Sequence, residues 1–326
     1  MLSISYLPKE DCFASVGAVN AIRVYAEGSK LRERFGHGLP PTHIQFYGRP
    51  DDHFILSAGR DATLKIFSPE HESGNRNLGK TTLYHKSKKA EHQMAPISEF
   101  ATSSNRESAW DNVVAIHRDG TRATTWSTKK LRRGDHWLSP ANDNVVIVSV
   151  ACSQCGNMAW VGREDGSLFE FNLQSGKLRK QYLANERRAH DGAIRGLGCQ
   201  ALQVALISAS CDGRLKAWRI KDGRFLEQME FEEPILKMKF EERRNLAAVA
   251  LGDFSIALVD CSGKPLTLSR RLPGHQAELT TLCWSSDAHW LATAAMDATI
   301  RVWDVATAQM IDQFKTPSIA TTIDFR

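Results

Sequence analysis

The stretch Gly274–Asp304, GHQAELTTLCWSSDAHWLATAAMDATIRVWD, contains the repeat unit that decides the fold. His275 lies 22 residues before Asp297, and Trp303 follows six residues after that Asp. The runs LTTLCW, WLATAA, TIRVWDV and, just beyond, QMIDQF are short, apolar and separated by turn residues. Apolar runs of this length predict four β-strands rather than helices.

The same spacing returns at His190, Asp212 and Trp218, and five more degraded copies share its frame. The anchor positions, spaced by 42, 58, 46, 47, 41 and 44 residues, are Val19, Asp61, Asp119, Asp165, Asp212, Asp253 and Asp297. This period is typical of the blades of WD-repeat β-propellers. We therefore predict an all-β chain: a seven-bladed WD-repeat β-propeller of four-stranded antiparallel blades.

The predicted propeller occupies residues 1–317. The 58-residue interval indicates an insertion, which we place at 68–96. Residues 318–326 include one further apolar run, SIATTIDF, and are expected to be an extra strand or the start of a missing region.

The polar residues of the repeat predict a structural network in which a turn Asp faces a His, and a hydroxyl links that His to a Trp indole. The two predicted sets are His190, Ser208, Asp212 and Trp218, and His275, Thr293, Asp297 and Trp303. A hydrolytic triad is the alternative, but the set recurs with the repeat and no nucleophile-elbow motif accompanies it.

Composition excludes several classes of function. The chain is 42% hydrophobic and 24% charged, and its net charge of +5 is compatible with an RNA or acidic-protein partner without selecting either. Seven cysteines favour a reducing compartment. Cys152 and Cys155 form a C-x-x-C pair, but zinc would require a second pair. We expect no enzyme activity, no cofactor, no metal site, no small-molecule substrate and no membrane segment.

The polar stretch 68–96 contains a run of basic side chains, from which we select Lys80, Lys86, Lys88 and Lys89 as a candidate contact loop. Long loops in compact domains tend to be functional or disordered. An ordinary solvated rim is the alternative, and within a contact role the partner is either protein or RNA. The short charge run, with only Tyr84 nearby for base stacking, favours a protein partner.

Several segments, among them SAGRDATLKIFSPEHES, NRESAWDNVVAIHRDG, LGDFSIALVD and GHQAELTTLCWSSDAHWL, resemble one family. This is the tandem WD-repeat propeller subunit of the UtpB subcomplex, the U-three small-nucleolar-RNA-associated protein twenty-one family. The resemblance extends to non-repeat features at Arg106–Asp111 and Asp253–Ile256. Members of that family are longer, so the chain is expected to represent one propeller of a larger protein.

The resemblance implies a non-catalytic scaffold of the small-subunit processome, acting in ribosome biogenesis and processing of small-subunit pre-rRNA. It implies a nuclear, nucleolar location and partners among the other subunits of the UtpB subcomplex. It also implies association with a pre-ribosomal particle containing small nucleolar RNA and pre-rRNA, whether direct or indirect. The alternatives are a WD-repeat adaptor or peptide-reading propeller in another complex, and a propeller enzyme with residues converging on the central channel.

Overall fold

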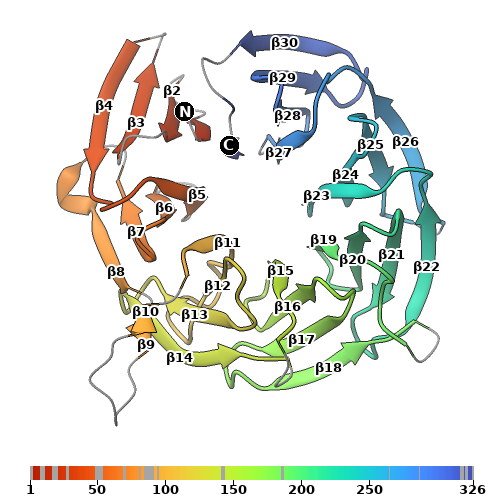
Figure 1. Ribbon diagram of the computed structural model, residues 1–326, viewed down its shortest axis with the longest axis horizontal. Coiled ribbons are helices and arrows are strands. Elements are labelled where there is room, and N and C mark those ends of the chain that lie inside the picture. The colour runs from red at the N-terminus through yellow and green to blue at the C-terminus, as the bar shows by residue number, and fades with distance from the viewer. Residues whose placement is uncertain are drawn as a thin grey trace.

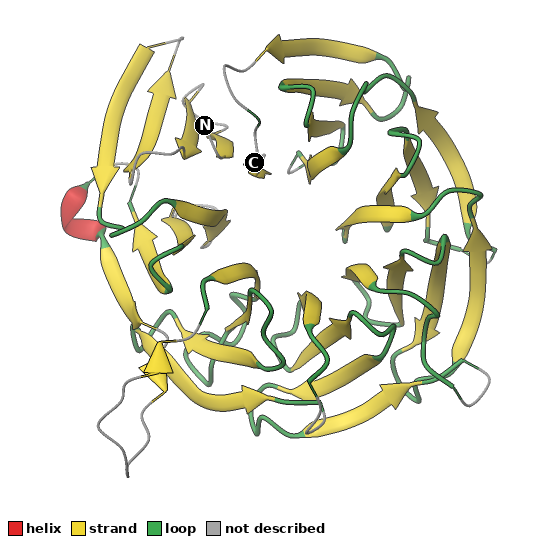
Figure 2. Cartoon of the chain, viewed as in Figure 1, coloured by secondary structure: helices red, strands yellow, loops and turns green. Residues whose placement is uncertain are grey.

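The computed structural model describes residues 3–7, 12–16, 21–26, 29–47, 54–68, 71–80, 82–83, 92–93, 95–140, 144–184, 187–263, 265–285, 287–315, 319 and 322–324. Within these residues the regular structure is almost entirely β, with sheets arranged radially in a ring (Figure 1). One short 3₁₀ helix, η1 (Glu72–Gly74), lies at the outside of the ring (Figure 2).

Six sheets are four-stranded antiparallel blades, in which chain order runs from the centre of the ring to its outside. The first three comprise β5 (Pro41–Tyr47), β6 (Phe54–Gly59), β7 (Thr63–Phe67) and β8 (Arg76–Lys80); β11 (Ile97–Thr102), β12 (Val113–His117), β13 (Ala123–Ser127) and β14 (Arg132–Leu138); and β15 (Ile147–Cys152), β16 (Met158–Arg163), β17 (Leu168–Asn172) and β18 (Leu178–Tyr182). The other three comprise β19 (Ile194–Cys199), β20 (Ala205–Ser210), β21 (Arg214–Arg219) and β22 (Phe225–Glu230); β23 (Ile235–Glu241), β24 (Leu246–Leu251), β25 (Ile256–Asp260) and β26 (Thr267–Leu272); and β27 (Leu279–Trp284), β28 (Trp290–Ala295), β29 (Thr299–Asp304) and β30 (Met310–Lys315).

The remaining sector of the ring has a different sheet. Its five strands, in spatial order, are β31 (Thr322–Asp324), β1 (Ser3–Leu7), β2 (Cys12–Val16), β3 (Ala21–Ala26) and β4 (Ser29–Phe35). β31 pairs with β1 in parallel, so this sheet is mixed. The prediction of seven four-stranded antiparallel blades is therefore wrong: six blades have that form. The repeat frame could not reveal the difference, because β31 follows the last copy and pairs across the whole length of the chain.

The hydrophobic core lies between neighbouring blades rather than inside any one of them. One cluster combines Ile207 and Leu215 from one blade with Val249 and Val259 from the next. Each strand exposes alternate side chains to the two faces of its sheet, and blades stacked radially bury both faces. The apolar runs of the second and third strands are accordingly buried almost throughout.

The stretch 68–96 contributes more to the fold than an insertion would. Residues 76–80 form β8, which pairs with β7 as the outer strand of its blade, and Leu78 is buried in the core. Farther along the chain, β9 (Thr82–Leu83) and β10 (His92–Gln93) form a small two-stranded ribbon beside the ring. A single apolar residue among polar neighbours is too weak a signal to predict a strand from sequence.

The two ends of the ring differ in which turns form them. At one end, the turn between the second and third strands of a blade bonds to the residue before its innermost strand, as Arg60 N–H does to Pro40 O and Cys211 N–H to Ala193 O. We call this end the Asp rim. The opposite end, formed by turns joining the first and second strands of each blade, is the hairpin rim.

Candidate interaction site

The anchor Asp residues lie in the turns of the Asp rim, and five of them accept a hydrogen bond from the backbone N–H two residues ahead: Asp61, Asp165, Asp212, Asp253 and Asp297. Asp212 Oδ1 accepts from Arg214 N–H at 2.9 Å, and Asp297 Oδ1 accepts from Thr299 N–H at 2.9 Å. The residue between them is left-handed: Gly213 has a φ of 76°. An Asp side chain stabilises such a turn by capping its backbone.

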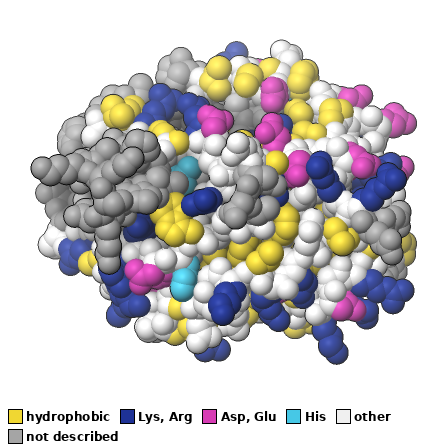
Figure 3. All heavy atoms as spheres, turned by 60° about the horizontal axis from the view of Figure 1, so that its bottom comes forward, with side chains coloured by type: hydrophobic (Ala, Val, Ile, Leu, Met, Phe, Trp, Pro, Cys, Tyr) yellow, Lys and Arg dark blue, Asp and Glu magenta, His cyan; other side chains and the backbone are white. Residues whose placement is uncertain are grey.

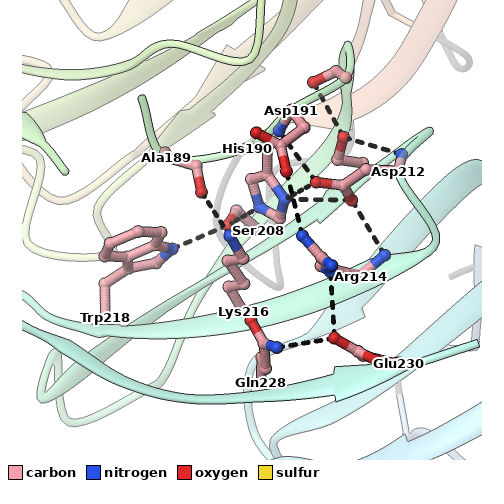
Figure 4. A network of polar contacts seen from close by, with 12 residues as sticks. Ala189, His190, Asp191, Ser208, Asp212, Arg214, Lys216, Trp218, Gln228 and Glu230 are labelled. Atoms are coloured by element: carbon pink, nitrogen blue, oxygen red, sulfur yellow. Dashed lines mark hydrogen bonds and ion pairs between the residues drawn. The ribbon is translucent and has the colours of Figure 1, made fainter. Parts of the chain in front are cut away.

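The structure brings the first predicted set, His190, Ser208, Asp212 and Trp218, into one hydrogen-bonded group (Figure 4). His190 Nδ1 lies 3.0 Å from Asp212 Oδ2, and His190 Nε2 lies 2.8 Å from Ser208 Oγ. Trp218 Nε1 donates to the same Ser208 oxygen at 2.8 Å. If Nδ1 donates to Asp212, the Ser208 hydroxyl donates to Nε2 and accepts from the indole. We call these four residues the His190 network.

The second predicted set repeats this arrangement two blades later, in the β27–β30 blade. His275 Nδ1 lies 3.2 Å from Asp297 Oδ2, and His275 Nε2 lies 2.8 Å from Thr293 Oγ1. Trp303 Nε1 donates to Thr293 Oγ1 at 2.9 Å. Thr therefore replaces Ser as the hydroxyl that links the imidazole to the indole.

Electrostatics favour a neutral imidazole beside an ionised carboxylate. Burial lowers the pKa of His190, although its hydrogen bond to the Asp212 carboxylate opposes this shift. Burial would raise the pKa of Asp212, but hydrogen bonds from His190 and from the N–H groups of Asp191 and Arg214 outweigh it and lower the pKa to about 2. Ser208 is fully buried and its oxygen is already bonded twice, so a substrate has no path to it as a nucleophile.

Related networks that sequence reasoning did not identify occur in other blades. In the β5–β8 blade, His37 contacts Asp61, Thr63 and Ser57, at 3.2, 3.0 and 3.0 Å, with Phe67 in the indole position. The degraded spacing around Asp61 was the signal that could have found it. In the β11–β14 blade, His117 bonds to Thr124, which also accepts from Trp126.

The β15–β18 blade uses a carboxylate in place of the hydroxyl. Glu170 Oε2 accepts from Tyr182 Oη–H at 2.6 Å and from Trp160 Nε1–H at 3.2 Å. Arg179 and Lys180 approach Glu170 Oε1 to 3.4 and 3.6 Å. Glu170 is completely buried. We call Trp160, Glu170 and Tyr182 the Glu170 network; no motif in the sequence marks it.

The candidate contact loop is only partly within the described residues. Lys80 is the last residue of β8, the outer strand of its blade. Lys86, Lys88 and Lys89 lie outside the described residues. On the face drawn in Figure 3, Lys and Arg side chains are spread among acidic and apolar ones rather than gathered in one field. The structure thus leaves the contact role of these lysines a prediction.

Charged side chains also come from the innermost strands, which surround the centre of the ring. Burial lowers the pKa of His43, on β5, to about 3, and the positive charges of Lys239 and Lys237 on β23 lower it further. Burial raises the pKa of Glu99, on β11, and the same two lysines oppose the shift. These charged side chains come from the innermost strands of separate blades, so no spacing within one repeat could predict that they lie near one another.

The described residues form neither a metal site nor a redox disulfide. They contain no group of three or more His, Cys, Asp or Glu side chains placed to hold a metal ion. Cys152 and Cys155 are both free thiols, and burial raises the pKa of Cys152 to about 12. In the described part of the chain, no helix is long and apolar enough to cross a bilayer.

These features define a WD-repeat propeller: radial four-stranded blades, each carrying an Asp turn, with a His–hydroxyl–Trp network where the repeat is best kept. The solved structure of a computationally designed protein, Ika8, shows the same fold, with a TM-score of 0.72 at 22% identity over 99% of this chain and 90% of that one. A sequence model described as the WDR36/Utp21 second beta-propeller domain matches residues 42–326. The chain belongs to the WDR36/Utp21 family.

Relatives from distant organisms support this assignment. The chain is 32% identical to WD repeat-containing protein 36 of Homo sapiens, over 95% of this chain and 36% of the relative. It is 31% identical to the U3 small nucleolar RNA-associated protein 21 homolog of Schizosaccharomyces pombe, over 99% and 36%. The chain thus spans about a third of the length of these relatives.

Proposed function

We propose that this propeller is a non-catalytic protein-interaction scaffold of the small-subunit processome, acting in ribosome biogenesis and the processing of small-subunit pre-rRNA. The observation that carries the proposal is the family match over residues 42–326, together with the U3 small nucleolar RNA association in the name of a relative. The proposed partners are other subunits of the UtpB subcomplex and the pre-ribosomal particle. The proposed location is the nucleolus.

A scaffold role also suits the chemistry of the blades. The His, Ser and Asp side chains that could be mistaken for catalytic residues are bonded to one another and to a buried indole. In the blades that have them, these side chains link the strands to one another and leave the rims and outer strands for contact. Propellers offer large rigid surfaces of this kind, with only short protected sheet edges.

The proposal is tested by affinity capture of the intact tagged protein followed by mass spectrometry and RNA analysis. We expect recovery of processome subunits with small nucleolar RNA and pre-rRNA, and delayed pre-rRNA processing when the protein is depleted. Capture of an unrelated complex, with processing intact, would instead favour an adaptor or peptide-reading propeller.

The contact loop is tested by changing Lys86, Lys88 and Lys89 to Glu. We expect this variant to lose one protein partner while RNA association survives, because the charge run is short. A matched control changes three exposed basic residues elsewhere, Lys177, Lys221 and Arg224, to Glu. If the lysines instead bind phosphate, RNA binding should weaken log-linearly with salt, less steeply in the loop variant. If both triple variants keep every partner, the loop is only a solvated rim.

A further inference from the structure

A polar pocket opens at the hairpin rim, where the innermost strands of four blades, β5, β11, β15 and β23, end. Its volume is about 240 Å³. The lining residues are Tyr47, Thr102, Ser103, Ser104, Asn105, Cys152, Gln154 and Glu242. They come from the end of β5, the β11–β12 and β15–β16 turns, and the residue just after β23. The pocket is assembled across the ring, so no single blade could form it.

The β11–β12 turn forms one wall and is fixed against the next blade. Ser103 Oγ and Asn105 Nδ2 both donate to Gln154 O, at 3.1 and 2.6 Å. Trp110 Nε1, from the same turn, donates to Gly156 O at 2.7 Å. Three hydrogen bonds to the β15–β16 turn therefore link this wall to the neighbouring blade.

Tyr47 forms a second wall and is equally constrained. Its phenol oxygen lies 2.8 Å from Thr128 Oγ1, accepts from Asn112 Nδ2 at 2.9 Å, and donates to the carboxylate of Glu107. Tyr47 is buried. A pre-formed site loses little conformational entropy when it binds.

Glu242 supplies the charge of the pocket. Among the described residues, no hydrogen bond or ion pair reaches its carboxylate, although the charge of Lys239 acts on it. Burial and the neighbouring charge of Glu241 raise the pKa of Glu242 to about 7, against the effect of Lys239. None of the eight lining residues is basic, in a chain whose net charge is +5. A shielded carboxylate without a close counter-ion is stabilised by a cation that brings hydrogen-bond donors.

The size of the pocket limits what can enter. Sites for drug-sized ligands usually occupy roughly 300–1,000 Å³. A pocket of about 240 Å³ is smaller than these and suits a single long side chain. Ser103, Ser104, Asn105 and Gln154 also line the pocket, and their hydroxyl and amide oxygens offer further acceptors. Arginine is a frequent anchor in such pockets at protein interfaces.

We propose that this pocket binds the side chain of one arginine or lysine presented by a partner protein, with Glu242 as its counter-ion. This inference rests on the scaffold function proposed above, because that function is the reason for taking the partner to be a polypeptide. The walls provided by Tyr47 and the β11–β12 turn position the aliphatic stem, and the hydroxyl and amide oxygens accept the remaining donors. Lysine and arginine are distinguished by the test.

The test is calorimetric titration of the intact protein at pH 8 with three acetylated, amidated tripeptides, Gly-Arg-Gly, Gly-Lys-Gly and Gly-citrulline-Gly. Citrulline has nearly the shape of arginine but no charge. We expect at least one cationic peptide to bind about tenfold or more tightly than the citrulline peptide, because a hydrogen bond to a charged group is worth about 1.5–3 kcal/mol. Equal affinity for all three peptides would overturn the proposal.

Three variants test whether the peptides bind in this pocket. Glu242→Gln should remove the preference for the cationic peptide, whereas Glu164→Gln, an exposed carboxylate on the Asp rim, should keep it. Ser104→Phe, at an exposed lining position, should block all three peptides by filling the pocket. Unchanged unfolding midpoints confirm that each variant is folded. Binding that survives both Glu242→Gln and Ser104→Phe lies elsewhere and refutes the site, while captured processome partners would leave the scaffold function standing.

Discussion

The β15–β18 and β19–β22 blades are neighbours that bury the same kind of side chain in different ways. Trp218 donates to the neutral hydroxyl of Ser208. The negative charge of the His190 network lies on Asp212, in a turn of the Asp rim. Trp160 instead donates to Glu170, whose carboxylate is completely buried. The requirement common to both blades is an acceptor for the indole N–H, because a buried donor without a partner is costly. The position of the charge is what differs.

Removing the buried carboxylate should have the largest effect. Glu170→Ala leaves the hydroxyl of Tyr182 without its acceptor, beside two basic side chains. It also removes one of the two acceptors of the Trp160 indole, which keeps only the Tyr182 oxygen at 3.1 Å. We expect a loss of about 3–5 kcal/mol in the free energy of unfolding, measured by denaturant titration. Glu170→Gln keeps an acceptor and should lose less. Losses below about 1 kcal/mol for both variants would mean that the buried charge is not needed.

The rim carboxylates should matter less. Asp212→Ala and Asp297→Ala each remove the partner of a buried imidazole and the cap of a turn. We expect a loss of about 1–3 kcal/mol for each, by the same denaturant titration. Asp191→Ala is the matched control, because its exposed ion pair with Arg214 is worth at most about 1 kcal/mol. Unchanged midpoints for both anchor variants would show that the turn Asp is only a solvated residue.

Acidification should produce the smallest difference between the two blades. The folded-state pKa of His190 is lowered from 6.5, mainly by burial, so the unfolded chain takes up the proton first as the pH falls. The stability that the neutral imidazole contributes is complete above about pH 6.5 and is lost below it. His190→Gln should therefore flatten the fall in unfolding free energy between pH 7 and 6. Glu170→Gln should leave that slope unchanged, since the Glu170 network contains no histidine.

The sequence could predict those features whose residues lie within one repeat. The His190 and His275 sets have a fixed offset within one repeat, so spacing alone indicated their members, and the structure brings them together. The four-stranded antiparallel form of six blades followed from the same period. Strand alternation and turn residues are local, and they survive even in degraded copies.

The remainder depends on contacts between distant residues. Glu170 and Tyr182 lie on adjacent strands but match no repeat position, and the pocket around Glu242 joins turns from separate blades. Likewise, β8 contains one buried residue, Leu78, in an otherwise polar run, and β31 pairs with β1 from the opposite end of the sequence. Burial and pairing of this kind are set by tertiary packing, which overrides local preference.

The parallel pairing of β31 with β1 has a consequence for the time course of synthesis. Each four-stranded blade can form from consecutive hairpins, whereas the five-stranded sheet needs segments about 315 residues apart. At about 5–20 residues per second, β1 waits roughly 15–60 s for its partner to be made. Until then the ring is an open arc, and the edge of β1 that later receives β31 is available to chaperones or to the strands of other chains.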